Sequence, residues 1–253
     1  MNSLISRTIS YLTRIDEPKI NKSKYPFRLI LIICFKSVNF MRLVKAYVII
    51  NKVDSLSEFF DSIHIFWFRG NEGHTQQSTE QTEYLKNFVQ EHQRIFEVGF
   101  NGGHSSETFL KNNSNVNVVS CDIGWHYYSR FGEMYLNKKY PGRFKLIYGD
   151  SKKVIPAYAD KYKEKFDAVY IDGGHEFEDA LKDIINSKSL STRETRLLVD
   201  DVIYQDNSNL HHANKGPTKA WAQMVDEGFL KHINNYEFKS NGLHRSVVIG
   251  SYK

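Results

Sequence analysis

Residues 94–110 read Arg94-Ile-Phe-Glu-Val-Gly-Phe-Asn-Gly-Gly-His-Ser-Ser-Glu-Thr-Phe-Leu110. A short apolar run containing an acid is followed by a glycine-rich turn and then by a helix-forming segment. Such a turn lets a ligand approach the backbone where a strand meets a helix N-terminus, whose free N–H groups and partial positive charge attract polar groups. The stretch therefore predicts a site for a nucleotide-like cofactor.

Short apolar runs alternate with longer amphipathic segments from residue 79 onward. A helix is expected over residues 79–91. The expected strands are residues 95–100, 116–121, 145–148, 168–171 and 197–199. The expected helices between them are residues 105–112, 127–138, 152–162 and 177–186. The strands are nearly all apolar, as in a parallel sheet covered on both faces. This alternation predicts an α/β fold with a doubly wound, mostly parallel sheet.

The C-terminal part has a different pattern. Pro217 is a favourable first helical residue, which predicts a helix over residues 218–227. Two further runs, residues 236–240 and 246–252, flank Asn241-Gly242, a dipeptide typical of tight hairpin turns. Five parallel strands and this antiparallel hairpin give a predicted sheet of seven strands.

The first third of the chain, residues 1–74, is expected to be a mainly helical extension that forms a lid or a homodimer contact. Residues 29–50 are strongly apolar, but Lys36, Arg42 and Lys45 interrupt them. A transmembrane helix needs about 18 or more apolar residues with few charges. We therefore expect no transmembrane segment but a buried or interfacial helix, and a peripheral membrane role stays open.

Composition limits the class of protein. The 253 residues are 41% hydrophobic, enough for a full core, and the net charge of +5 is spread along the chain. A nucleic-acid-binding protein usually has a denser basic stripe, so no nucleic-acid partner is expected. Cys34 and Cys121 are far apart and no secretory signal is visible, which predicts reduced thiols and a cytoplasmic protein.

Acidic residues recur at the ends of the predicted strands, where open α/β sheets bind ligands. These residues are Glu97, Asp122, Asp150, Asp172 and the pair Asp200-Asp201. Asp122 lies about 20 residues beyond the turn, the position of an acid that binds ribose hydroxyls. Asp150 is placed to face an adenine amino group. An acid after a strand is also a common helix N-cap, and Glu97 fits a structural role in the turn equally well.

The motifs resemble those of class I S-adenosylmethionine-dependent methyltransferases, over residues 75–253. The turn Glu97-Val-Gly-Phe-Asn-Gly-Gly103 resembles their first motif, Phe166-Asp-Ala-Val-Tyr-Ile-Asp-Gly-Gly-His175 their fourth-strand motif, and Leu198-Val-Asp-Asp-Val202 the fifth. The nearest subgroup contains small-molecule O-methyltransferases, including macrolide-sugar enzymes and relatives of the catechol enzymes. The resemblance implies S-adenosylmethionine bound by Glu97, Gly99, Asn101, Gly102, Gly103, Asp122, Asp150 and Asp172.

The same resemblance implies a metal-assisted mechanism on a hydroxylated small molecule, a sugar or a phenol. A divalent cation such as Mg²⁺ would be held by Asp172, Asp200 and Asp201, and Asp172 would be catalytic. His175, which follows Asp172 through two glycines, is the first candidate for a catalytic base, and His104 and the pair His211-His212 are other candidates. The alternative is that one of these acids caps a helix and another contacts the cofactor.

Two other functions are compatible with such a fold. One is a non-catalytic cofactor-binding module, which would not need the acids at the fourth and fifth strands. The other is a nucleic-acid methyltransferase, in which an Asn-Pro-Pro-aromatic tetrad would be expected where this chain has Asp172-Gly-Gly-His175. A nicotinamide enzyme is disfavoured because the turn lacks the G-x-G-x-x-G spacing.

Overall fold

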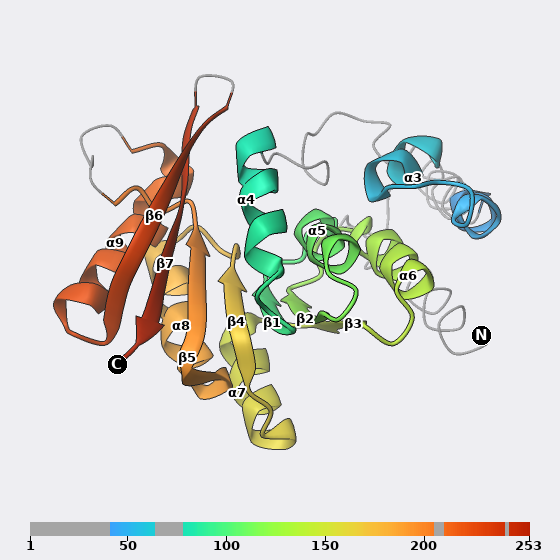
Figure 1. The fold of residues 1–253 in the computed structure, drawn as a ribbon. Helices are drawn as coiled ribbons and strands as arrows, with labels where there is room; N and C mark the ends of the chain where they lie inside the picture. The colour runs from blue at the N-terminus through green and yellow to red at the C-terminus, as the bar shows by residue number, and fades with distance from the viewer. Residues whose placement is uncertain (1–40, 64–77, 205–209, 241–242) are drawn as a thin grey trace, which may run out of the picture.

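The structure is a computed structural model that describes residues 41–63, 78–204, 210–240 and 243–253. Its centre is one seven-stranded sheet with the order β3-β2-β1-β4-β5-β7-β6 (Figure 1). The strands are β1 Arg94–Val98, β2 Asn117–Asp122, β3 Phe144–Tyr148, β4 Phe166–Ile171, β5 Ser191–Asp200, β6 Leu230–Ser240 and β7 Leu243–Tyr252. Strands β1 to β5 are parallel, and β7 pairs antiparallel with both β5 and β6. The predicted fold class is confirmed.

Helices cover both faces of the sheet, as the apolar strands require. The helices are α3 Leu56–Ser62, α4 Thr79–Val89, α5 His104–Asn112, α6 Ser129–Lys139, α7 Ser151–Tyr162, α8 Phe177–Ser187 and α9 His212–Asp226. One apolar core lies between the sheet and the helices α3, α4, α5 and α6, and it contains side chains such as Leu85, Phe109 and Phe131. A second core, containing Ile184 and Trp221, lies on the face of α7, α8 and α9.

Helix α9 begins at His212, so the prediction that Pro217 is the first helical residue is wrong. The cap is His211, whose Nδ1 accepts a hydrogen bond from the Ala213 N–H at 3.4 Å. Histidine is not among the favoured N-cap residues, which explains why sequence reasoning placed the start too late. Pro217 lies inside the helix, where its ring removes one backbone hydrogen bond.

The N-terminal extension is helical where it is described, at residues 41–49 and in α3. It packs on α5 and α6 rather than standing apart: the Leu56 N–H donates to Glu107 Oε1 at 2.8 Å, and the Phe59 and Tyr135 rings lie 5.2 Å apart. The predicted boundary at residue 74 falls in residues 64–77, outside the described residues. Among the helices that are described, none has the length and apolar character needed to cross a bilayer.

Candidate active site

The glycine-rich turn connects β1 to α5 and depends on left-handed backbone. Gly99 has φ +93°, and a Cβ there would lie 1.9 Å from the Asp172 carbonyl oxygen. Asn101 has φ +50°, a conformation that asparagine tolerates better than most residues. The Phe100 and Asn101 N–H groups donate to Asp122 Oδ2 at 3.0 and 2.8 Å. The end of β2 therefore holds the turn in shape.

Glu97 points into the protein and does not line a cavity. It is fully buried, and its carboxylate accepts hydrogen bonds from the hydroxyls of Ser105, Ser106 and Ser120. Burial raises the pKa of Glu97, while the three serine hydroxyls favour the charged form. The side chain ties the start of α5 to β1 and β2, which is the structural role that the sequence left open.

A cavity of about 430 Å³ lies at the carboxyl edge of β1 to β4. Five of the predicted binding residues line it: Gly99, Asn101, Asp122, Asp150 and Asp172. Gly102 and Gly103 do not. Gly103 is the N-cap of α5 and has left-handed backbone. Gly102 packs closely against α6, because a Cβ at Gly132 of α6 would lie 2.1 Å from the Gly102 carbonyl oxygen. These two glycines shape the turn and are not part of the cavity wall.

Asp122 and Asp150 serve as structural acceptors while also lining the cavity. Asp122 accepts the two turn N–H groups on Oδ2 and the Gly124 N–H on Oδ1 at 2.7 Å. Asp150 caps α7 by accepting the Lys152 N–H at 3.0 Å. A carboxylate has about four acceptor positions. Each side chain therefore keeps capacity for a ligand, and the N-cap role does not exclude the binding role.

Asp172, His175 and Asp201 come together beside this cavity. One ligand atom from each lies within 4.8 Å of the others. His175 Nε2 is 3.3 Å from Asp201 Oδ2, and this hydrogen bond raises the pKa of His175. Burial raises the pKa of Asp172 well above its usual range, and the nearby Asp200 and Asp201 raise it further. The group can hold a cation or move a proton.

Asp200 does not belong to this group, although the sequence placed it in the metal site. It is buried, and its Oδ2 accepts hydrogen bonds from Gln81 Nε2 at 2.8 Å and from the Tyr170 hydroxyl at 2.7 Å. Burial, followed by the charge of Asp201, raises the pKa of Asp200 to about 7. His175 stands in the group where Asp200 was expected.

Sequence reasoning missed Asp183, on α8, which lines the same cavity. The side chain is 1% exposed, and its Oδ1 has no hydrogen-bond partner among the described residues. Burial raises its pKa to about 7, although a hydrogen bond from Ser151 opposes the shift. A signal existed: Asp183 falls on the apolar stripe of α8 with Ala180 and Ile184.

Two more groups line the rim of the cavity, an aromatic ring and an ion pair. Trp125 is 79% exposed and lines the cavity, so it is not a core residue. Lys152 Nζ pairs with Asp179 Oδ1 at 2.7 Å and joins α7 to α8. A flat aromatic ring and an ion pair therefore border the opening.

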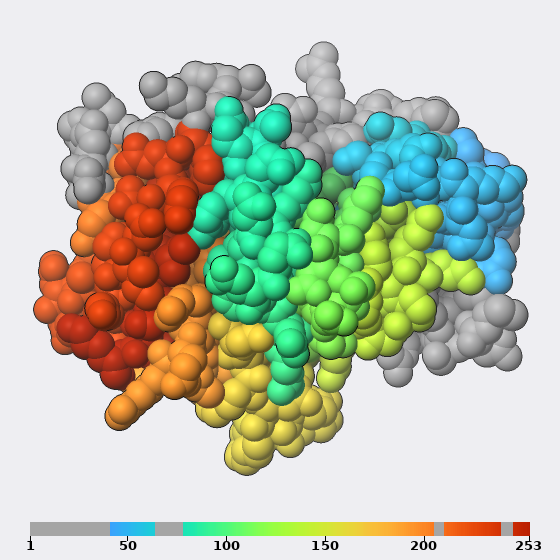
Figure 2. All heavy atoms as spheres, in the orientation of Figure 1, coloured from blue at the N-terminus to red at the C-terminus, as the bar shows by residue number. Residues whose placement is uncertain are grey.

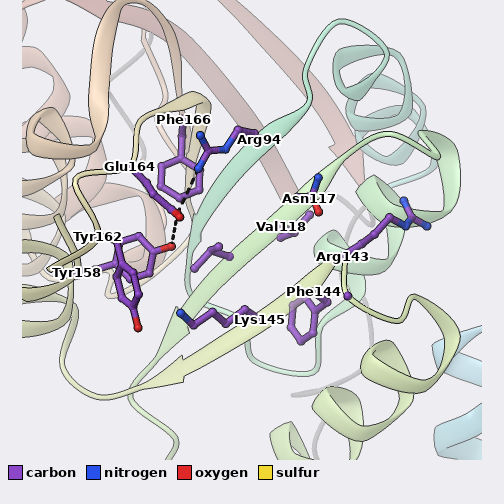
Figure 3. A pocket seen from close by; sticks show the side chains of 12 residues that line it. Arg94, Asn117, Val118, Arg143, Phe144, Lys145, Tyr158, Tyr162, Glu164 and Phe166 are labelled. Atoms are coloured by element: carbon purple, nitrogen blue, oxygen red, sulfur yellow. Dashed lines mark hydrogen bonds and ion pairs between the residues drawn. The ribbon is translucent and has the colours of Figure 1, made fainter.

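A second hollow of about 290 Å³ lies at the amino edge of the same strands (Figure 3). Its charged groups already have partners: Arg94 pairs with Glu164 at 3.2 Å, and Arg143 donates to the carbonyls of Leu110 and Asn113. Lys145 Nζ lies 4.2 Å from the ring centroid of Tyr162. These contacts connect the strands to α7, to the segment after α7 and to the end of α5, so the charged groups of this hollow are engaged within the protein.

The comparisons with known proteins agree with this geometry. Residues 96–202 match the model of a family described as a methyltransferase domain. The fold is similar to an O-methyltransferase from Bacillus cereus solved with SAH (17% identity, 85% of this chain and 100% of that chain, TM-score 0.62). It is also similar to the O-methyltransferase TomG from Streptomyces achromogenes, solved with SAM (15% identity, 83% and 95%, TM-score 0.62). A comparison with curated proteins gave no match.

The family match covers residues 96–202, and the two solved O-methyltransferases share the fold of this chain.

Proposed function

We propose that this chain transfers a methyl group from S-adenosylmethionine to a hydroxyl of a small molecule. The observation that carries the proposal is the carboxyl-rich lining of the carboxyl-edge cavity. Its lining includes one lysine, Lys152, and the five aspartates Asp122, Asp150, Asp172, Asp179 and Asp183. An acidic lining repels the phosphates of a dinucleotide but suits a ligand with a sulfonium, an ammonium and ribose hydroxyls.

The cavity also fits such a ligand in size and in hydrogen-bonding capacity. Binding cavities for molecules of this class measure about 300–1,000 Å³, and this one is about 430 Å³. Asp122 would accept from the ribose hydroxyls and Asp150 from the adenine amino group. The backbone at Gly99 and Asn101 would pass beneath the ligand. Both O-methyltransferases named above were solved with the cofactor or its product.

His175 and Asp201 would handle the acceptor proton. When bound, the cofactor supplies a methyl group activated by positive sulfur. His175, 43% exposed on its side chain, would accept the hydroxyl proton, and Asp201 would hold the imidazole and stabilise its charged form.

A divalent cation is the alternative occupant of the Asp172, His175 and Asp201 group. Two carboxylates and an imidazole within 4.8 Å fit a cation, which would offset the burial and the repulsion by Asp200 and Asp201 that raise the pKa of Asp172. Imidazole suits transition metals better than Mg²⁺, which prefers oxygen ligands. A metal would hold a substrate hydroxyl and lower its pKa. Activity that survives a chelator would favour the His175 base.

The test of the proposed function has two stages. Calorimetry with S-adenosylmethionine should show micromolar or tighter binding to the full chain, followed by transfer of labelled methyl to members of a phenol and sugar panel. Transfer should be lost in His175→Asn with cofactor affinity retained. Binding without transfer to any acceptor would support a non-catalytic module instead, and transfer to RNA or DNA would support the nucleic-acid alternative.

A further inference from the structure

The helix of residues 41–49 has one apolar face that is buried and one whose side chains are largely exposed. Leu43 and Ala46, with Ile50 just beyond the helix, are buried in the same apolar core as Leu56, Phe59 and Phe60 of α3. The other face consists of large apolar side chains that leave half or more of their surface in solvent: Met41 (62%), Val44 (51%), Tyr47 (52%) and Val48 (56%). Single exposed apolar residues are ordinary, but four on one short helix indicate an interaction surface.

The charge of the surrounding sequence identifies what this face meets. Residues 18–53 contain eight basic residues and no acidic residue. The basic residues are Lys19, Lys22, Lys24, Arg28, Lys36, Arg42, Lys45 and Lys52. Since the net charge of the whole chain is +5, the rest of the chain has a net charge of −3. The positive charge of this protein is therefore concentrated in the segment that contains the exposed apolar face.

We infer that this helix docks on the surface of an anionic lipid bilayer. An amphipathic helix with lysine or arginine beside a row of large apolar side chains lies in the membrane interface, where acyl chains cover the apolar side and anionic headgroups attract the basic side.

A second copy of the chain is a poorer occupant of this face. Pairing the face with itself would bring Arg42, Lys45 and Lys52 of two copies together, and the described residues 41–53 contain no acid to offset the repulsion. An anionic bilayer supplies the opposite charge and an apolar layer together.

The docking surface is separate from the methyl-transfer site. The residue 41–49 helix contributes no lining residue to the carboxyl-edge cavity. Together with α3 it forms one flank of the molecule, where Figure 2 shows its atoms in blue. Substitutions on the exposed face therefore test docking without disturbing cofactor binding, and the inference does not depend on the proposed function.

Vesicle flotation of the full chain tests the inference. The protein should float with phosphatidylcholine vesicles that contain phosphatidylserine, should not float with phosphatidylcholine alone, and should be released by added salt. Lys45→Gln with Lys52→Gln should lower the partition coefficient by about fivefold for each lysine. Val44→Glu with Val48→Glu should lower it at least about tenfold, by removing apolar contact.

A matched control for the single substitution Val44→Glu is Ile233→Glu, which places the same charge on an exposed apolar residue of β6 (44% exposed). It should float like the wild type, and all variants should keep the wild-type melting temperature and affinity for S-adenosylmethionine. No flotation with anionic vesicles would overturn the inference. So would equal flotation of the Val44→Glu, Val48→Glu variant, or sedimentation showing a dimer that this variant dissociates.

Discussion

The two edges of the parallel sheet are formed by the same strands, but charged groups are paired at the amino edge and carboxyl groups accumulate at the carboxyl edge. At the amino edge the charges are neutralised within the protein, as in the pair of Arg94 and Glu164 at 3.2 Å. At the carboxyl edge acids accumulate, the pKa of Asp172 and Asp183 is raised, and Asp183 Oδ1 has no partner among the described residues. The difference teaches that a hollow alone does not indicate a binding site. Buried polar groups without partners inside the protein, such as Asp183 Oδ1, are the better indication.

The largest expected effect comes from glycines at the two edges. Gly99 and Gly142 both have left-handed backbone, with φ +93° and +79°, but a Cβ at Gly142 would meet nothing within 4 Å. Gly142→Ala should cost only the strain of about 1–2 kcal/mol. Gly99→Ala adds a clash with the Asp172 carbonyl, so it should destabilise the fold further and abolish cofactor binding, as measured by denaturant unfolding and calorimetry. Equal effects of the two substitutions would remove the distinction between the edges.

The second largest effect is expected from replacing one of two carboxylates, each of which accepts hydrogen bonds from two successive backbone N–H groups. Asp122 accepts those of Phe100 and Asn101, and Asp167 at the amino edge accepts those of Gln93 and Arg94. Asp122→Ala should weaken S-adenosylmethionine binding about 100-fold, because the turn loses its support and the ligand its acceptor. Asp167→Ala should lower stability by about 1 kcal/mol and leave binding unchanged. Calorimetric titration of both variants distinguishes a ligand role from a purely structural one.

A pH dependence follows from Asp183. Its pKa is about 7 in the folded protein and about 4 in an unfolded chain. Between these values the folded state binds more protons, so stability falls as pH rises through the window and is level above it. Asp183→Asn removes this loss. The difference in free energy of unfolding between the variant and the wild type should therefore shift by about 2 kcal/mol in favour of the variant from pH 5 to pH 8. Urea unfolding at both pH values measures it; parallel curves would contradict a neutral buried carboxyl.

The smallest effect is expected at the amino-edge hollow. Lys145 lies over the rings of Tyr158 and Tyr162, contacts that contribute about 0.5–1 kcal/mol at exposed sites. Lys145→Gln should therefore lower the free energy of unfolding by less than about 1 kcal/mol and leave cofactor binding and methyl transfer unchanged. A loss of activity in this variant would show that the amino edge takes part in function.

The sequence predicts the sheet well because its strands are short, apolar and regularly spaced. It predicts the ends of the last strands less well, since the polar stretch from Lys231 to Asn235 in β6 breaks the apolar pattern that marks a strand. The paired neighbour β7 supplies the register that the sequence alone does not contain.

For the site, the sequence predicts which residues lie at the ends of strands, but it does not predict the direction in which each side chain points. Asp122, Asp150 and Asp172 follow strands and line the cavity as expected. Glu97 precedes the end of β1 and points inward, and Asp200 is engaged by Gln81, which is 119 residues away in the sequence. Such long-range contacts are set by packing, which no local pattern reveals.

The most direct test of the central claim is a crystal structure of the full chain with S-adenosylhomocysteine. We expect density for the adenosyl group in the carboxyl-edge cavity, with the ribose against Asp122 and the homocysteine beside Gly99. A ligand in the amino-edge hollow, or no binding at saturating ligand, would contradict the account.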